Sequence, residues 1–163
     1  MSAWRHLAAV LLCPGVVTVA VPALIGWSTG ATIGLLGLLG LPLIALGLLL
    51  IVRTIALFAE VGRGTLAPWD PTTRLVVRGP YRYVRNPMIS GVLFVLLGEA
   101  ALFGSLPLLA WFALVLAVNA VYLPLVEEPG LERRFGDDYE RYRAHVPRWI
   151  PRLRPWDGEE FSR

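Results

Sequence analysis

The stretch MISGVLFVLLGEAALFGSLPLLAWFALVLAVNAVYLPLV, residues 88–126, decides the fold. It holds two nearly uninterrupted apolar runs, 88–103 and 106–126, separated only by Gly104 and Ser105. A helix needs about 20 mainly apolar residues to cross the hydrocarbon core of a bilayer. Ser105 is a residue type that caps helix N-termini, so the second run is expected to begin there. The stretch therefore predicts a tight hairpin of two membrane-spanning helices.

Two more apolar runs, 7–27 and 33–58, lie upstream. The first contains Pro14 and Pro22, which predict a kinked helix. We interpret it as an uncleaved span rather than a signal peptide, because it is long and another apolar run follows almost at once. The second carries small residues that let neighbouring helices approach closely, namely Gly34, Gly37, Gly40 and Gly47. With 56% hydrophobic residues, the chain is predicted to be an all-α integral membrane protein with four transmembrane helices.

The distribution of charge predicts the orientation of these spans. All 15 basic residues are arginine, and the absence of lysine excludes Schiff-base chemistry through lysine. The links 27–32 and 103–107 carry no charge, whereas the segment 53–85 holds Arg53, Arg63, Arg74, Arg78, Arg82 and Arg85. By the positive-inside rule both termini and the loop 59–87 are predicted to be cytoplasmic. Arginines that flank spans are expected to meet anionic lipid rather than nucleic acid.

The C-terminal segment 127–163 is rich in charged residues. Within it four apolar residues recur at helical spacing, Leu131, Phe135, Tyr142 and Val146. This pattern predicts an amphipathic cytoplasmic helix that lies against the bundle or the membrane surface. No repeat separates the chain into parts, so residues 1–163 are predicted to form a single membrane domain.

The chain has few residues that can bind metal or act as nucleophiles, and this excludes several kinds of site. Cys13 is the single cysteine, so no intrachain disulfide is possible. His6 and His145 are the two histidines, and we predict no metal centre. The sequence has no P-loop, no GxSxG elbow and no Gly-rich turn after a strand. A soluble Rossmann-type enzyme is therefore excluded.

Two segments are candidates for chemistry. The loop ends in TRLVVRGPYRYVRNPMISG, residues 73–91, which is either a positively charged anchor with interfacial tyrosines or a polar pocket at the membrane face. The acidic pair Glu127 and Glu128 follows the fourth apolar run. Acidic residues at a helix C-terminus are disfavoured by the helix dipole, although such pairs are usually just solvated. This unfavourable placement suggests a ligand.

Glu99 and Asn119 are polar residues inside the predicted spans. Burying an unpaired polar group in the hydrocarbon costs a few kcal/mol. We expect Glu99 to reach the outer interface and Asn119 to hydrogen-bond a neighbouring helix.

Taken together, GPYRYVRNPMISG, the hairpin and EEPGLERRFGDDYERYRAHVPRWIP resemble the isoprenylcysteine carboxyl methyltransferase and phospholipid methyltransferase superfamily. The resemblance covers roughly residues 73–151. It implies S-adenosylmethionine as the methyl donor, bound in a pocket that faces the cytoplasm. The family's cofactor-contacting His-x-Leu-Val stretch falls on Thr73, Arg74, Leu75 and Val76, and the tyrosine that follows it falls on Tyr81. Its Arg-His-Pro-x-Tyr motif falls on Arg85, Asn86, Pro87, Met88 and Ile89, and its cofactor-binding glutamate falls on Glu127.

The chemistry of these residues agrees with the resemblance in outline. A carboxylate such as Glu127 pairs with the α-ammonium of the donor, Arg85 or backbone N–H groups hold its carboxylate, and Tyr81 stacks on or hydrogen-bonds the adenosine. The chain departs from the family pattern at Thr73 and Asn86, which replace histidines, and at Ile89, which replaces a tyrosine.

One further departure bears on the methyl acceptor. Relatives that methylate a carboxylate carry a substrate-contacting arginine one turn before the glutamate, and this chain has Leu123 there. The leading hypothesis is therefore a membrane-embedded methyltransferase for a small lipophilic acceptor other than a prenylcysteine carboxylate. The alternatives are a non-catalytic assembly or lipid-interaction protein with the same fold, and a transporter subunit. The catalytic residue, the attacking atom of the acceptor and the oligomeric state are not predicted.

Overall fold

The computed structural model of the chain describes residues 11–61 and 75–157. Thr73 and Arg74, the first residues of the run 7–27 and the tail beyond residue 157 lie outside the described residues. Within the two described ranges all regular structure is helical and no strand occurs. The predicted all-α class is therefore confirmed for this part of the chain.

The helices follow the predicted apolar runs. A π-helical stretch η1 (Leu11–Ala20) continues as α2 (Val21–Thr29), and a 3-10 helix η2 (Leu36–Gly40) continues as α3 (Leu41–Val61). The short 3-10 helix η3 (Gly79–Arg82) precedes α4 (Pro87–Phe103). After the hairpin turn come α5 (Leu106–Tyr122), the π-helical stretch η4 (Leu123–Glu127), α6 (Glu128–Phe135) and α7 (Asp137–His145).

Two of these helical stretches are long and apolar enough to cross a bilayer. They are Gly37–Leu57 and Leu106–Phe135, with mean hydropathies of 2.3 and 2.1. Two shorter apolar helices, Gly15–Thr29 and Pro87–Phe103, accompany them. The prediction of four spans is thus supported by length and composition for two helices, and stays a prediction for the other two.

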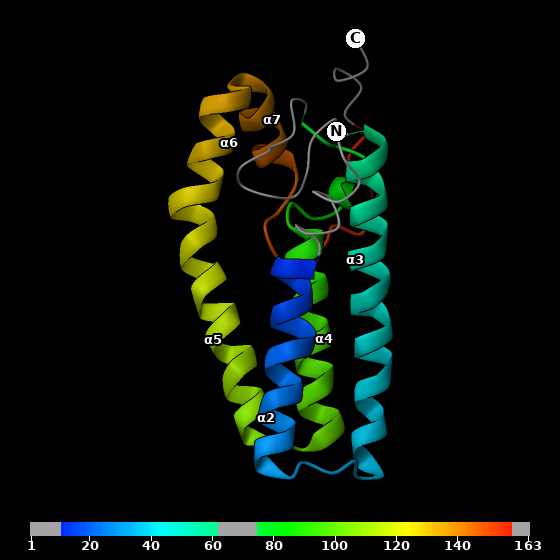
Figure 1. The fold of residues 1–163 in the computed structure, drawn as a ribbon. Helices are drawn as coiled ribbons and strands as arrows, with labels where there is room; N and C mark the ends of the chain where they lie inside the picture. The colour runs from blue at the N-terminus through cyan, green and yellow to red at the C-terminus, as the bar shows by residue number, and fades with distance from the viewer. Residues whose placement is uncertain (1–10, 62–74, 158–163) are drawn as a thin grey trace.

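The long helices run side by side (Figure 1). α4 packs between α3 and α5, and α2 contacts both α4 and α5. The α2–α3 link and the α4–α5 turn lie at one end of this bundle, while η3, α6 and α7 lie at the other, which we call the charged end. Trp111 on α5 donates a hydrogen bond of 3.1 Å to the carbonyl of Val17 in η1, which ties the first helical stretch to the hairpin.

The hairpin turn forms as predicted. Gly104 ends α4 in the left-handed conformation (φ 55°), which glycine adopts without steric cost. Ser105 then begins α5, and its hydroxyl accepts a hydrogen bond of 3.4 Å from the backbone N–H of Leu108. Two residues are therefore enough to reverse the chain.

Glycines allow α3 and α4 to lie in close contact. A Cβ placed on Gly47 would lie 2.5 Å from the carbonyl oxygen of Gly91, and one on Gly98 would lie 2.8 Å from that of Gly40. The predicted close approach is thus confirmed at Gly40 and Gly47, and Gly37 likewise faces the backbone of α4. At Gly34, by contrast, an added Cβ would have no atom within 4 Å, so this glycine makes no such contact.

The apolar side chains divide between a small core and a large exposed surface. The core cluster consists of Ile51, Val92, Leu93, Val95, Leu96 and Val115. Many large apolar residues on η2, α3 and α5 are exposed, among them Leu39, Val52, Leu114 and Val121. A bundle that exposes so much apolar surface is suited to lipid rather than to water.

The predicted end of the fourth helix at residue 126 is wrong. The helix continues without a break from Leu106 to Phe135. Pro124 lacks the N–H for a normal helical bond, and the π-helical geometry of η4 accommodates it. The predicted single amphipathic helix is instead divided at Gly136, where a φ of 51° separates α6 from α7.

Asn119 also differs from its prediction. Its side-chain amide donates a hydrogen bond of 2.8 Å to the carbonyl of Val115, so it is paired within its own helix rather than with a neighbour. A side chain four residues after a carbonyl reaches it easily, which satisfies the amide without a second helix. Glu99 keeps one buried oxygen, Oε2, with no hydrogen-bond partner in the described part of the chain.

Candidate active site

The loop before α4 is held to the charged end by apolar anchors. Val76 and Val84 are 5% and 4% exposed. Leu75 and Val77 pack against the second core cluster, which Tyr139, Tyr142 and Val146 form. Gly79 begins η3 with a φ of 53°, and Pro80 follows it, so the chain turns sharply here. The loop therefore has a defined course between α3 and α7.

A C-terminal segment that we call the strap, residues 146–157, runs back along this loop. The backbone N–H of Arg85 donates to the carbonyl of Pro147 (2.9 Å), and that of Arg152 donates to the carbonyl of Tyr83 (3.0 Å). Near the end of the strap, the N–H of Trp156 donates to the carbonyl of Arg82 (3.0 Å). Sequence reasoning missed this contact, because irregular segments have no periodicity that predicts their pairing.

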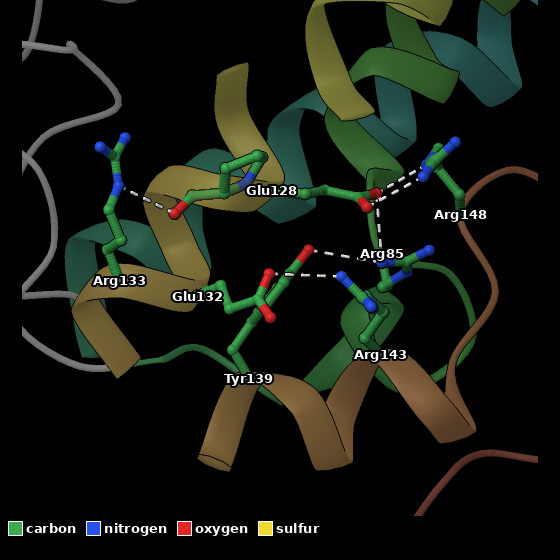
Figure 2. Close-up of polar contacts among 8 residues, drawn as sticks. Arg85, Glu128, Glu132, Arg133, Tyr139, Arg143 and Arg148 are labelled. Atoms are coloured by element: carbon green, nitrogen blue, oxygen red, sulfur yellow. Dashed lines mark hydrogen bonds and ion pairs between the residues drawn. The ribbon is translucent and has the colours of Figure 1, made fainter. Parts of the chain in front are cut away.

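A buried carboxylate lies where α6, the loop and the strap meet (Figure 2). Arg148 donates to both oxygens of Glu128, from Nε at 2.6 Å and from Nη2 at 2.9 Å. Arg85 lies 3.1 Å from Glu128 Oε1, and the Arg85 and Glu128 side chains are only 10% and 7% exposed. A buried charge of this kind is tolerated only when it is paired, and bidentate guanidinium pairing is the strongest form. The hydrogen bonds to Glu128 also raise the pKa of Arg148.

Three tyrosines surround this charged cluster. Tyr139 accepts a hydrogen bond of 3.3 Å from Nη1 of Arg85, and Tyr142 donates one of 2.7 Å to the carbonyl of Tyr81. Burial raises the pKa of Tyr81, and the negative charge of Glu127 raises it further. Burial likewise raises the pKa of Tyr139 and Tyr142. All three therefore stay neutral hydroxyls near pH 7.

The structure brings several predicted site residues to one place. Arg85 belongs to the charged cluster, and Glu127 lies close enough to Tyr81 to act on its pKa. Arg85 pairs with Glu128, the neighbour of the predicted cofactor residue Glu127. The spacing of Glu128, Leu131 and Phe135 gives the signal that could have found it, because residues three and four apart share one helix face. Leu131 and Phe135 both pack against the core cluster of α7.

The remaining predicted residues within the described ranges pack or hydrogen-bond at the start of α4 and in the loop before it. Asn86 precedes α4, and its carbonyl accepts hydrogen bonds of 3.0 Å from both the backbone N–H and the hydroxyl of Ser90. Pro87 is buried in the first turn, and Ile89 packs against the core of the bundle. Met88 is half-buried beside them. Leu75 and Val76 are apolar anchors, while Thr73 and Arg74 lie outside the described residues.

An apolar cavity of about 480 Å³ lies beside the charged cluster. It is lined by Leu50, Pro80, Tyr83, Val84, Ser90, Leu93, Phe94, Leu97, Phe112, Trp149 and Pro151. None of these residues is charged, and neither Glu99 nor Asn119 is among them. Its volume falls within the range of small-molecule sites, which are typically about 300–1,000 Å³.

The cavity and the charged cluster share a wall. Val84 lines the cavity and the next residue, Arg85, pairs with Glu128. On the strap, Trp149 lines the cavity and the preceding Arg148 pairs with the same carboxylate. Two irregular segments therefore lie between the apolar cavity and the charged cluster.

One donor of the charged cluster lacks an acceptor among the described residues. Nε of Arg85 is buried and has no hydrogen-bond partner among residues 11–61 and 75–157. A buried N–H without an acceptor is destabilising, so an anionic ligand group at this point fits the site. The same ranges contain no group of three His, Cys, Asp or Glu residues placed to hold a metal ion.

Comparison with known proteins gives the family. The model of the phospholipid methyltransferase family matches residues 35–138. Protein-S-isoprenylcysteine O-methyltransferase of Schizosaccharomyces pombe is 40% identical over 77 residues, which are 47% of this chain and 33% of that protein. The match thus spans about a third of the length of this curated relative. No solved structure matches the chain. The family match extends over α3, the loop and the hairpin up to the start of α7, and by it the chain belongs to the phospholipid methyltransferase family of membrane methyltransferases.

Proposed function

We propose that the chain is a membrane-embedded, S-adenosylmethionine-dependent methyltransferase that acts on a small lipophilic acceptor. The observation that carries this proposal is the wall shared by the apolar cavity and the charged cluster. Methyl transfer to a lipophilic acceptor needs a polar donor and an apolar acceptor next to each other. The apolar cavity and the charged cluster meet at Val84 and Arg85.

The proposed topology has four spans, with both termini, the loop and the charged end on the cytoplasmic side. The continuous helix Leu106–Phe135 has 30 residues, and at 1.5 Å per residue it is about 45 Å long. Because this exceeds the hydrocarbon thickness of about 30 Å, its charged end extends beyond the apolar layer. Arginines around α6, α7 and the strap then lie on the side that the positive-inside rule favours.

The cofactor site is proposed at the charged cluster. Nε of Arg85 has no hydrogen-bond partner within the described ranges and is suited to donate to a carboxylate, and Glu127 is suited to an ammonium group. Tyr81, which is neutral and within electrostatic range of Glu127, is proposed to contact the adenosine with its ring. Asn86, Pro87, Met88 and Ile89 begin α4 next to this site, and Thr73, Arg74, Leu75 and Val76 are proposed to complete it by family resemblance.

The acceptor is proposed to be uncharged. Leu123 is completely buried, at the position where carboxylate-methylating relatives carry an arginine. Ser90 and Tyr83 are the hydroxyl-bearing residues of the cavity lining, which is otherwise made of apolar and aromatic side chains. Transferring a carboxylate into such surroundings without a counter-charge is strongly unfavourable, so the lining selects against a prenylcysteine carboxylate.

S-adenosylmethionine supplies an electrophilic methyl group when it is bound. The chain's own contribution is to hold the two reactants in line and to exclude water, which in favourable cases accounts for most of the rate enhancement. The apolar cavity excludes water. The paired Arg85, Glu128 and Arg148 hold the segments between the cavity and the charged cluster in one conformation. The neutral tyrosines are not bases near pH 7, and a good nucleophile does not require one.

The non-catalytic alternative is not favoured. A scaffold needs neither a cavity of about 480 Å³ nor a buried, unsatisfied guanidinium donor beside it. Binding of the cofactor and transfer of its methyl group are separate measurements, so they distinguish the two possibilities.

The test is calorimetric titration of S-adenosylmethionine into the full chain purified in detergent. We expect binding, and we expect Glu127→Gln to abolish or strongly weaken it. Glu140→Gln, an exposed change on α7, is the matched control and should bind as the unmodified chain does.

The same preparations are then supplied with donor labelled in its methyl group and with a lipid extract. Label that appears in an apolar product supports the proposal. Folded protein that binds no donor would overturn the cofactor assignment, binding that ignores Glu127→Gln would overturn the site, and binding without transfer to any extract would support the non-catalytic alternative.

A further inference from the structure

The strap has two different sides. Trp149 and Pro151 line the cavity, whereas Ile150 is 78% exposed and Leu153 is completely exposed. Large apolar side chains so fully exposed in an otherwise well-anchored segment are uncommon unless another surface covers them. We call the exposed residues Ile150, Leu153 and Arg154 the outer face of the strap.

The backbone that carries the outer face is anchored to the rest of the chain. Arg148 binds Glu128 at the beginning of the strap. The N–H of Arg152 donates to the carbonyl of Tyr83, and the ring of Trp156 stacks on that of His145 with centroids 5.1 Å apart. Ile150 and Leu153 are therefore displayed between anchored points and do not belong to a loose tail.

The charge of the outer face is positive. Arg152 and Arg154 flank Leu153 directly in the sequence. The strap contains one acidic residue, Asp157, and Arg82 of η3 already forms an ion pair with it. Apolar side chains interleaved with arginines are the pattern of segments that lie in the headgroup region of an anionic bilayer.

The position of the strap along the bundle fits the depth of the headgroup region. In Figure 1 the chain descends from α7 to the level at which α4 begins and then turns toward α3. Leu50 of α3 and Pro151 of the strap line the same cavity, and Arg53 is exposed one turn further along α3. An exposed arginine on an apolar helix extends its guanidinium to the headgroups, so this turn of α3 marks the interface.

We propose that the outer face of the strap is a membrane-binding surface. Ile150 and Leu153 insert into the boundary between acyl chains and headgroups at the charged end, and Arg154 binds anionic headgroups. Arg152 holds the strap in place, because its Nη1 donates a hydrogen bond of 2.8 Å to the carbonyl of His145. Removing the Ile150 and Leu153 side chains from water and bringing Arg154 to an anionic surface are both favourable. The surface goes beyond the proposed methyl transfer and rests only on insertion of the bundle in a bilayer.

The test measures the depth of single nitroxide labels on the full chain in lipid nanodiscs. Leu153→Cys and Ile150→Cys are each made on a Cys13→Ala background, and Glu140→Cys on α7 is the matched water-exposed control. Collisions with oxygen report lipid, and collisions with a water-soluble nickel chelate report water. We expect a several-fold higher ratio of oxygen to chelate collisions at positions 150 and 153 than at 140.

A second arm tests the exposed arginine. Adding phosphatidylglycerol to phosphatidylcholine nanodiscs should draw the label at position 153 deeper, and Arg154→Gln should reduce that response. Labels at 150 and 153 as open to the chelate as the label at 140 would overturn the proposal. So would labels shielded from both reagents, since a protein partner or a second copy would then cover the strap. A depth unaffected by lipid charge would overturn the headgroup contact. None of these outcomes depends on methyl transfer.

Discussion

Arg148 and Glu128 are joined by two hydrogen bonds of 2.6 and 2.9 Å, although they lie 20 residues apart in the chain. This pair fastens the strap to α6 at the point where the long helix leaves the predicted bilayer. Arg85 binds the same carboxylate from the loop, so a single glutamate connects three separate segments. The integrity of the charged end is therefore expected to depend on Glu128.

Glu128→Gln should destabilise the chain by about 3 kcal/mol, because it leaves two guanidiniums beside a buried neutral group. The measurement is the free energy of unfolding, or the thermal unfolding midpoint, of the protein in detergent. Glu132→Gln removes a half-exposed ion pair to Arg143 and should change stability by less than about 1 kcal/mol. Equal effects of the two substitutions would contradict the role given to Glu128.

Gly47→Ala should destabilise the bundle by about 1–3 kcal/mol, because the added methyl group meets the backbone of Gly91 on α4. The same unfolding measurement checks it. Gly34→Ala is the control, since a side chain there has nothing within 4 Å. If both variants unfold at the same point, the close α3–α4 contact is not what determines stability.

Arg85→Lys should weaken binding of S-adenosylmethionine about tenfold, equivalent to about 1.4 kcal/mol. Lysine keeps the positive charge beside Glu128 but lacks the Nε–H that is unpaired in this structure. Calorimetry measures the Kd, and Arg82→Lys, whose partner is Asp157, serves as the control. An unchanged Kd in a variant of unchanged stability would remove Arg85 from the cofactor site.

Leu97→Trp should reduce transfer to bulky acceptors several-fold without changing the affinity for the donor, because the larger ring occupies the apolar cavity. Labelled-methyl transfer with a series of lipophilic acceptors measures the KM for each. Leu109→Trp adds the same ring on the outer surface of α5, where the side chain is 42% exposed. An increase in KM that occurs equally in both variants, or for small and large acceptors alike, would argue against the cavity as the acceptor site.

The parts of the fold that local chemistry determines were predictable from the sequence. Gly104 and Ser105 fix the hairpin, because one adopts a positive φ and the other caps the next helix. The end of the last long helix was not predictable in this way. Polarity changes after Val126, but a helix ends only when its backbone hydrogen bonds end, and η4 carries them past Pro124.

The candidate site could be predicted only in part. The sequence motifs indicated Arg85 and an acidic pair, yet adjacent glutamates look alike in a sequence, and only packing of α6 against α7 makes Glu128 the buried one. The strap and the cavity depend on pairing between segments more than 60 residues apart, such as Tyr83 with Arg152. No local pattern encodes such pairing, because it arises from the assembled tertiary structure.

The wall at Val84 and Arg85, and at Arg148 and Trp149, also bears on how this protein can diversify. In each pair one residue lines the apolar cavity, and its neighbour in the sequence belongs to the charged cluster. Point substitutions at Val84 or Trp149 can therefore reshape acceptor preference while the ionic network stays in place. An insertion or deletion of a single residue would instead place a guanidinium in the apolar cavity. Descendants of this chain should vary in the identity of these two residues and keep the length of both segments constant.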